Sequence, residues 1–142
     1  MDSIAEKRLR DAGLRPTKHR ICVLARMLED AMPLSHLDLL NRLSAYKLDR
    51  VTVYRILALL KDAGLVHQVQ GTDGIWRFCA HDETAGACPG GHPHLLCEIC
   101  GQMRCLSDQK MPHFDVPQDF QVTHKQMLIL GICAKCQAQQ PT

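Results

Sequence analysis

The sequence predicts an α+β protein with an N-terminal winged helix-turn-helix domain and a small C-terminal domain built around a four-cysteine zinc site. Three segments with helical spacing of apolar residues precede two short strand-like runs. Two Cys-x-x-Cys pairs follow a break that is rich in glycine and proline. At 142 residues and 46% apolar composition, the chain is long enough for two small domains with modest cores.

Apolar periodicity and capping residues predict the first two helices. One helix runs from Thr17 to Ala31, where Thr17 follows Pro16 and is placed to cap the first turn. The next begins at Ser35, because Ser35 and Asp38 have the spacing of a capping box. Its expected apolar stripe consists of Leu37, Leu40 and Leu43.

A third helix and a hairpin complete the expected winged helix. This helix runs from about Asp49 to Ala63, and Gly64 supplies its stop. Its expected buried face consists of Val53, Ile56, Leu57 and Leu60. Residues 65–70 and 75–79 predict two strands, and the turn-forming sequence between them predicts a hairpin. We assign residues 1–80 to this domain.

A break in composition separates the two predicted domains. Residues 82–93 contain three glycines and two prolines and interrupt every periodicity. We therefore place a hinge at residues 81–93 and a second domain at residues 94–142. Its strand-like runs surround the two Cys-x-x-Cys pairs.

Those two pairs are Cys97 with Cys100 and Cys133 with Cys136, and each stands where a predicted strand ends in a tight turn. Four thiolates placed in this way reach tetrahedral geometry around one Zn²⁺ at about 2.3 Å. Such a closed site is structural, and it stabilises a domain whose core is small. A redox dithiol is the alternative, but that motif needs one pair in a βαβ setting, which the sequence lacks.

Charge and composition restrict the class of protein. Residues 1–80 hold 13 Lys and Arg against 9 Asp and Glu, whereas residues 81–142 hold 4 against 6. The basic half is compatible with a nucleic-acid partner. The sequence shows neither an apolar run long enough to span a membrane nor the apolar core of a signal peptide. We therefore expect a soluble, cytoplasmic protein without a membrane partner.

Polar residues in the first two turns of the third helix are candidates for DNA contact. They are Arg50, Thr52, Tyr54 and Arg55. A surface arginine or tyrosine usually has no specific partner. A winged helix, however, places its third helix in a major groove, where such groups bond phosphates and base edges.

Several motifs, in order along the chain, point to one family. They are Gly13–Thr17 with Arg20, Thr52–Leu57 with Gly64–Val66, His92–Gly101, and Gly131–Cys136. Together they resemble the ferric uptake regulator family, most closely its zinc uptake regulator branch, over about residues 10–136. The resemblance implies a winged-helix domain, a hinge and an α/β dimerisation domain, working as a homodimer on double-stranded DNA.

The resemblance also implies DNA contacts. Tyr54 and Arg55 would contact the major groove, and Arg15 would enter the adjacent minor groove. An arginine suits the narrow, strongly negative minor groove of A·T-rich DNA. The expected operator is an A·T-rich inverted repeat that matches the two-fold symmetry of the dimer.

The remaining candidate ligands for a sensory metal are His67, Cys79, His92, His94 and Cys105. They stand on both sides of the predicted hinge, so a metal held by them would tie the hinge to the second domain. His92 and His94 share a face in an extended chain. A lone histidine is usually solvated and a lone cysteine is usually a small buried hydrophobe, so only the cluster predicts a site.

The type of these ligands favours zinc. The family's iron sensors tend to have acids where this chain has Cys79 and Cys105. Thiolates with imidazoles favour Zn²⁺, whereas Fe²⁺ and Mn²⁺ prefer oxygen-rich six-coordinate sites. Cys79 and His67 also resemble ligands of zinc uptake regulators. We therefore expect one structural and one regulatory Zn²⁺ per chain, with four of the five candidates binding the second.

The expected function is zinc-responsive repression of zinc uptake genes, with the metal as corepressor. The alternative is a sensor of the same family for iron, manganese, nickel or peroxide, and peroxide stays open because exposed thiols oxidise. We expect no catalytic residues and no small-molecule substrate. A zinc enzyme would need a motif such as HExxH, which is absent. A thiol oxidoreductase would be left with Cys22 and Cys88 once the ligands are assigned.

Two features depart from the family pattern. Gly91 and Pro93 interrupt the histidine-rich run of a second sensory site, so we expect that site to be missing and His124 to have no metal role. Pro112 and Pro117 leave little room for a long helix in the C-terminal domain.

Overall fold

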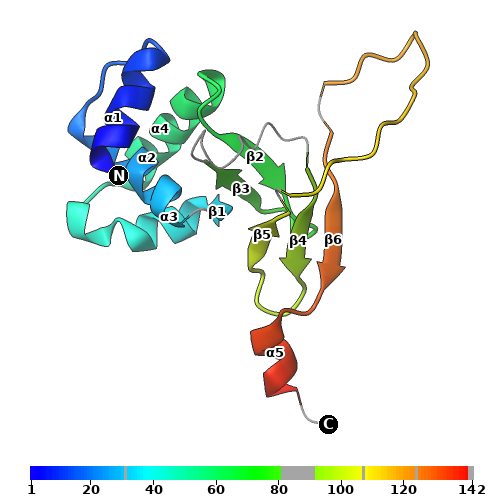
Figure 1. Cartoon of the computed structure of the whole chain (residues 1–142). Helices are drawn as coiled ribbons and strands as arrows, with labels where there is room; N and C mark the ends of the chain where they lie inside the picture. The colour runs from blue at the N-terminus through cyan, green and yellow to red at the C-terminus, as the bar shows by residue number, and fades with distance from the viewer. Residues whose placement is uncertain (31, 81–91, 107, 124, 141–142) are drawn as a thin grey trace. The chain divides into compact units, whose positions relative to one another are not determined.

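The structure is a computed structural model that describes residues 1–30, 32–80, 92–106, 108–123 and 125–140 (Figure 1). The chain divides into two compact units, residues 1–88 and 89–142. Most of the predicted hinge, residues 81–91, lies outside the described residues, as do Cys88 and His124.

The N-terminal unit contains four α-helices and a three-stranded sheet. The helices are α1 (Asp2–Asp11), α2 (Lys18–Asp30), α3 (His36–Arg42) and α4 (Arg50–Asp62), and a 3₁₀ turn spans Ser44–Tyr46. The strands are β1 (Leu34–Ser35), β2 (His67–Gln70) and β3 (Trp76–Cys79). They are antiparallel in the order β1-β3-β2, so the β2–β3 hairpin is the predicted wing.

The capping residues set the starts of the helices as predicted. The backbone N–H of Arg20 donates to Thr17 Oγ1 over 3.3 Å. Ser35 and Asp38 form the complete capping box, with bonds of 3.1 and 2.9 Å. At α4, the N–H of Thr52 donates to Asp49 Oδ1 over 2.7 Å. The helix that carries the candidate DNA contacts is therefore fixed at its first turn.

One apolar core holds the helices of this unit together. The four predicted residues of α4, Val53, Ile56, Leu57 and Leu60, are all buried in it. The predicted stripe of α3 is wrong in one position, because Leu37 is exposed and Leu39 is buried instead. Leu39 and Leu43 are four residues apart and share a face, which turns Leu37 outward.

Besides the 3₁₀ turn, two elements of this unit were not predicted. The first is α1, which is mostly charged and buries only Ala5 and Leu9, one turn apart. Such a narrow stripe gives a weak periodic signal. The second is β1, whose two residues pair with Phe78 and Arg77 of β3. A strand this short has no detectable alternation.

A tight turn closes the wing. The N–H of Gly71 donates to the carbonyl of Ile75 over 3.0 Å, and Gly74 has φ of 78°. A Cβ on Gly71 would collide with the Arg77 guanidinium, which forms an ion pair with Asp73 over 2.8 Å. The positive φ therefore favours glycine at position 74, whereas a side chain at position 71 would have to displace the Arg77–Asp73 pair.

The C-terminal unit is a three-stranded sheet followed by a short helix. Its elements are β4 (His94–Cys97), β5 (Met103–Cys105), β6 (Leu128–Gly131) and α5 (Ala134–Gln139). The order is β5-β4-β6, with β4 antiparallel to β5 and parallel to β6. The predicted β-rich run at 122–132 forms a strand only at Leu128–Gly131, and the described residues between β5 and β6 form neither helix nor strand.

Among the described residues, no helix has both the length and the apolar character that a membrane crossing requires.

The core predicts a stability difference within the winged helix. Leu57→Ala removes a side chain that is 1% exposed, so we expect a loss of about 2–5 kcal/mol in the free energy of unfolding. Leu37→Ala is the matched control, and we expect a change of about 0.5 kcal/mol or less there because Leu37 is exposed. Urea unfolding followed by circular dichroism measures both, and equal losses would contradict the assigned core.

Candidate metal centres and DNA-binding surface

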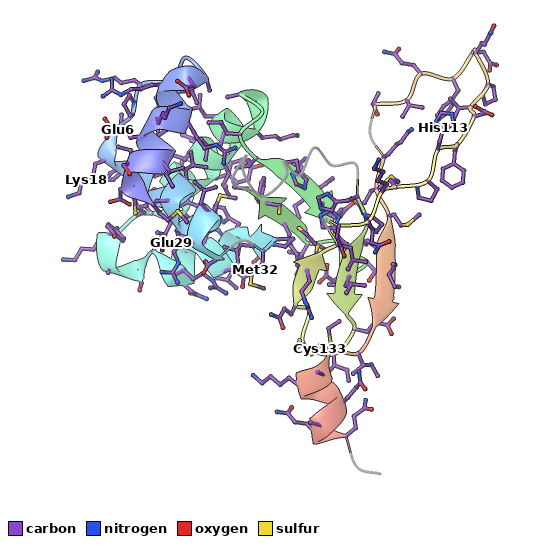
Figure 2. All side chains as sticks on the ribbon, in the orientation of Figure 1. Glu6, Lys18, Glu29, Met32, His113 and Cys133 are labelled. Carbon is purple, nitrogen blue, oxygen red and sulfur yellow. The ribbon has the colours of Figure 1, made fainter. Side chains whose placement is uncertain are left out.

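Parallel pairing of β4 and β6 brings the two Cys-x-x-Cys pairs to one end of the sheet. Cys97, the last residue of β4, lies opposite Gly131, the last residue of β6. Cys133 lies two residues after Gly131 and immediately before α5. Cys136 lies in the first turn of α5. Figure 2 shows Cys133 where β6 leads into α5. Strand register thus brings together cysteines more than 30 positions apart.

The four sulfur atoms form a compact cluster. Sγ atoms of Cys97, Cys100, Cys133 and Cys136 all lie within 4.8 Å of one another. The Cys100 and Cys133 sulfurs are 3.8 Å apart. A tetrahedral ion with metal–sulfur bonds of about 2.3 Å places its sulfurs about 3.8 Å apart. The cluster therefore matches a four-thiolate metal site.

The surroundings of the four thiols favour the thiolate form at Cys97 and oppose it at Cys136. The backbone N–H of Cys133 donates to Cys97 Sγ over 3.4 Å and, with that of Cys100, lowers the pKa of the Cys97 thiol to about 6. The neighbouring Cys133 thiol and burial raise the pKa of Cys136 to about 12. Four thiolates this close repel one another, so a cation among them is needed to ionise all four at neutral pH.

A second group of metal-binding side chains lies at the opposite end of β4. The donor atoms of His92, His94 and Cys105 lie within 4.8 Å of one another. His94 and Cys105 are directly opposite in the β4–β5 pairing. The imidazole rings of His92 and His94 have centroids 4.7 Å apart, in keeping with the shared face that their spacing predicts. The group offers two nitrogen donors and one sulfur donor.

This second group is held firmly by its backbone and is mostly shielded from solvent. The N–H of His94 donates to the carbonyl of Met127, and the N–H of Leu106 donates to that of Pro93, each over 3.0 Å. His92 and His94 are buried, and Cys105 is half-buried. Donors held in place before a metal arrives lose little conformational entropy on binding it.

The two other predicted ligands lie in the N-terminal unit. His67 of β2 and Cys79 of β3 are directly opposite in the wing sheet. Cys79 is buried and His67 is half-buried. Side chains directly opposite in an antiparallel pair have Cβ atoms about 5 Å apart, so this imidazole and this thiol can bind one ion.

The candidate DNA-reading residues lie on one exposed helix surface. Arg50, Tyr54 and Arg55 are exposed and Thr52 is half-buried, while the opposite face of α4 enters the core. Arg15 is exposed in the turn that precedes α2. Its carbonyl accepts a hydrogen bond of 2.9 Å from the Arg20 guanidinium, so Arg20 fixes the segment that presents Arg15.

His36, the first residue of α3, was not predicted as a functional residue. Its Nε2 lies 3.1 Å from the carbonyl of Arg50, to which it donates in the tautomer that carries the proton there. Its ring meets that of Tyr54 edge to face, with centroids 5.6 Å apart and planes at 71°. His36 thus positions Tyr54 on α4. Only the packing of two helices reveals this role, because the residues are 18 positions apart.

A groove of about 580 Å³ lies between α4 and the wing. Arg50 and Lys61 place two positive charges along it, Asp62 places one negative charge there, and Tyr54 and Trp76 add aromatic surface. An excess of cations beside an exposed helix suits the phosphate backbone of a nucleic acid.

Comparison with known proteins places the chain in one family. Residues 11–136 match the profile of the Ferric uptake regulator family. The peroxide-responsive repressor PerR of Staphylococcus aureus is 29% identical over 145 residues, which cover 96% of this chain and 90% of PerR.

Two solved structures share the fold. A zinc uptake regulator complexed with zinc and DNA has a TM-score of 0.66 at 22% identity, covering 97% of this chain and 93% of that one. Holo XcZur has a TM-score of 0.62 at 25% identity, covering 97% of this chain and 99% of that one.

The four-cysteine cluster predicts a metal content that one substitution changes. We expect Cys100→Ser to lose about one metal ion per chain, because a tetrahedral site of four thiolates tolerates the loss of a ligand poorly. Cys22→Ser is the matched control, since Cys22 lies on α2 outside the cluster. Mass spectrometry of the metals in the purified proteins measures both. A full complement in Cys100→Ser would contradict the site.

Proposed function

The chain belongs to the ferric uptake regulator family, whose members are metal-responsive transcriptional regulators, and on that premise we propose that it is a zinc-responsive repressor of zinc uptake genes. The observation that carries the choice of zinc is the cluster of His92, His94 and Cys105. Two imidazoles and a thiolate suit Zn²⁺ better than Fe²⁺ or Mn²⁺, which prefer oxygen ligands.

Two zinc ions per chain with different roles follow from the two clusters. The four thiolates would hold a structural ion in a closed site. The His92, His94 and Cys105 group supplies three donors, one fewer than a tetrahedral ion takes. We propose Cys79 as the fourth ligand, because a thiolate is a soft donor that suits Zn²⁺. His67 is the second choice, because an imidazole also suits Zn²⁺.

Zinc would act by shifting a population. The regulatory ion, bound by residues that precede and follow the predicted hinge, would favour the conformations of the homodimer that bind DNA. Zinc can shift the equilibrium between DNA-binding and other conformations only by binding the first more tightly than the second. If the DNA-binding conformation is a minor one without zinc, this difference in binding free energy must be several kcal/mol. A multidentate zinc site can supply this free energy.

The winged helix would read the operator directly. Tyr54 and Arg55, with Arg50 and Thr52, would contact the major groove and its phosphates, and Arg15 the adjacent minor groove. Support comes from the exposure of this surface and from the positioning of Tyr54 by His36. The proposed operator is an A·T-rich inverted repeat bound by a homodimer.

Peroxide sensing is the second candidate, and the similarity to the S. aureus PerR favours it. Cys105, which is half-buried, would be accessible to oxidation when no metal holds it, whereas Cys79 is buried. The two candidates differ in what releases the DNA. Zinc removal alone should do so for a zinc sensor, whereas a peroxide sensor with its metals in place should respond to oxidant.

Substitution of a regulatory ligand tests the zinc proposal. We expect Cys105→Ser and Cys79→Ala each to keep about one zinc per chain and to lose zinc-dependent DNA binding. Binding is measured to duplexes selected from random sequence by the zinc-loaded wild type, before and after mild chelation. Cys22→Ser should behave as the wild type does. Zinc-independent DNA binding by the wild type, lost on peroxide treatment, would reject zinc in favour of peroxide.

Substitution on α4 tests the proposed DNA contacts. We expect Tyr54→Ala and Arg55→Ala each to weaken operator binding by about 10- to 100-fold, the equivalent of about 1–3 kcal/mol per base contact. Metal content should not change, because neither residue belongs to a metal cluster. Arg10→Ala removes an exposed charge from α1 and is the control. Losses as large in Arg10→Ala would show a general effect of charge.

A further inference from the structure

One stripe of α4 is apolar and exposed between two arginines. Val51, Tyr54 and Ala58 follow one another at intervals of three and four residues, so they share one side of the helix. All three are exposed, Val51 by 56% and Tyr54 by 66%. At about 100° per residue, Arg50 and Arg55 lie on opposite sides of this stripe, and both are exposed. The stripe therefore has a cation at each edge.

The backbone on both sides of Val51 is held by side chains. His36 Nε2 lies 3.1 Å from the carbonyl of Arg50, and the N–H of Thr52 donates to Asp49 Oδ1 over 2.7 Å. A valine in a helix adopts one χ1 rotamer in about 90% of cases, because its branched side chain crowds the preceding turn. The two methyl groups of Val51 therefore lose little freedom when another molecule contacts them.

Neither packing nor helix propensity accounts for a valine at position 51. The side chain lies outside the core of the N-terminal unit, and valine favours an exposed helix position less than alanine does. A single exposed apolar residue is common on protein surfaces, but Val51 lies one turn from the exposed Tyr54. A contiguous apolar stripe of this kind is typical of a surface that another molecule covers.

Double-stranded DNA fits this stripe in charge and in chemistry. The arginines at its edges match the two phosphate backbones that border a major groove. Between those backbones, the base edges carry one kind of apolar group, the C5-methyl group of thymine. The N-terminal residues of a reading helix lie nearest the base edges, and Val51 is the exposed apolar residue of the first turn of α4.

We propose that Val51 reads the C5-methyl group of one thymine in each half of the operator. This contact would favour T·A over the other three base pairs at one position without forming a hydrogen bond. The proposal rests on the DNA binding of the proposed function and adds an apolar base-reading residue to the polar ones given there. It supplies one physical source for the preference of the proposed operator for A·T pairs.

Deoxyuridine in the DNA tests this contact, because it differs from thymidine only in lacking the C5-methyl group. Each thymine of a duplex selected from random sequence by the zinc-loaded wild type is replaced in turn. Binding of the full-length protein is measured by fluorescence anisotropy at one salt concentration. We expect one position in each half-site at which the replacement weakens binding by about three- to fivefold, the loss for one buried methyl group.

The same duplexes show whether Val51 makes the contact when Val51→Ala replaces the wild type. We expect this variant to bind the thymidine and deoxyuridine duplexes within about 1.5-fold of each other at that position, because the contacting methyl groups are gone. Alanine favours the helix, so circular dichroism and metal content should not change. Ile4→Ala is the matched control, because it shortens a β-branched side chain of α1 that is 37% exposed. It should keep the deoxyuridine effect of the wild type.

Two results would overturn the proposal. One is a wild type that shows no deoxyuridine effect at any thymine. The other is a Val51→Ala variant that keeps every effect, and loss of those effects in Tyr54→Ala would then assign the methyl contact to Tyr54.

The proposed function has a separate readout, the dependence of DNA binding on zinc. A methyl effect that requires Val51 in a protein whose DNA binding ignores zinc would reject zinc sensing and retain the thymine contact. Zinc-dependent binding without a methyl effect would do the reverse, and a wild type that selects no duplex would reject both.

Discussion

The parallel pairing of β4 with β6 is the constraint on which the C-terminal unit depends. It places Cys97 and Gly131 opposite each other, so both cysteine turns leave the sheet at the same end. The unit has three short strands and one helix of six residues, which bury little apolar surface. A metal ion that joined the four thiolates would replace the core that the unit lacks, and its binding free energy would become folding free energy.

The same strand carries the proposed regulatory group at its other end. His94 begins β4 and Cys97 ends it, about 10 Å apart at the rise of an extended chain. A structural ion at Cys97 would therefore anchor the strand that presents His94, while the bonds of His94 to Met127 and of Pro93 to Leu106 fix its start. The proposed structural site would prepare the geometry of the proposed regulatory one without sharing a ligand with it.

Local signals in the sequence were sufficient for much of this architecture. Thr17, Ser35 and Asp49 cap helices where the sequence predicted starts, and the residues of α4 predicted to be buried are buried. Long-range features were not predictable. The opposition of His94 to Cys105 follows from strand register, and the contact of His36 with Tyr54 follows from helix packing. A single sequence records neither, because its periodicity reports which face is buried and not what lies against it.

Residues 108–123, which connect β5 to β6, differ from a helical crossover. Pro112 and Pro117 indicate that a long helix is disfavoured, but they do not say what replaces it. The structure replaces it with an extended segment whose apolar residues are exposed.

Hydrogen bonds hold the backbone of the winged helix near three of its proposed reading positions. Arg20 holds the carbonyl of Arg15, His36 holds that of Arg50, and Asp49 caps the helix that presents Tyr54. A surface fixed in this way binds DNA with little loss of conformational entropy. It also leaves little within the reading surface itself for a metal to rearrange. The proposed zinc signal therefore has to act outside that surface, on the population of conformations that present both winged helices of a dimer to one operator.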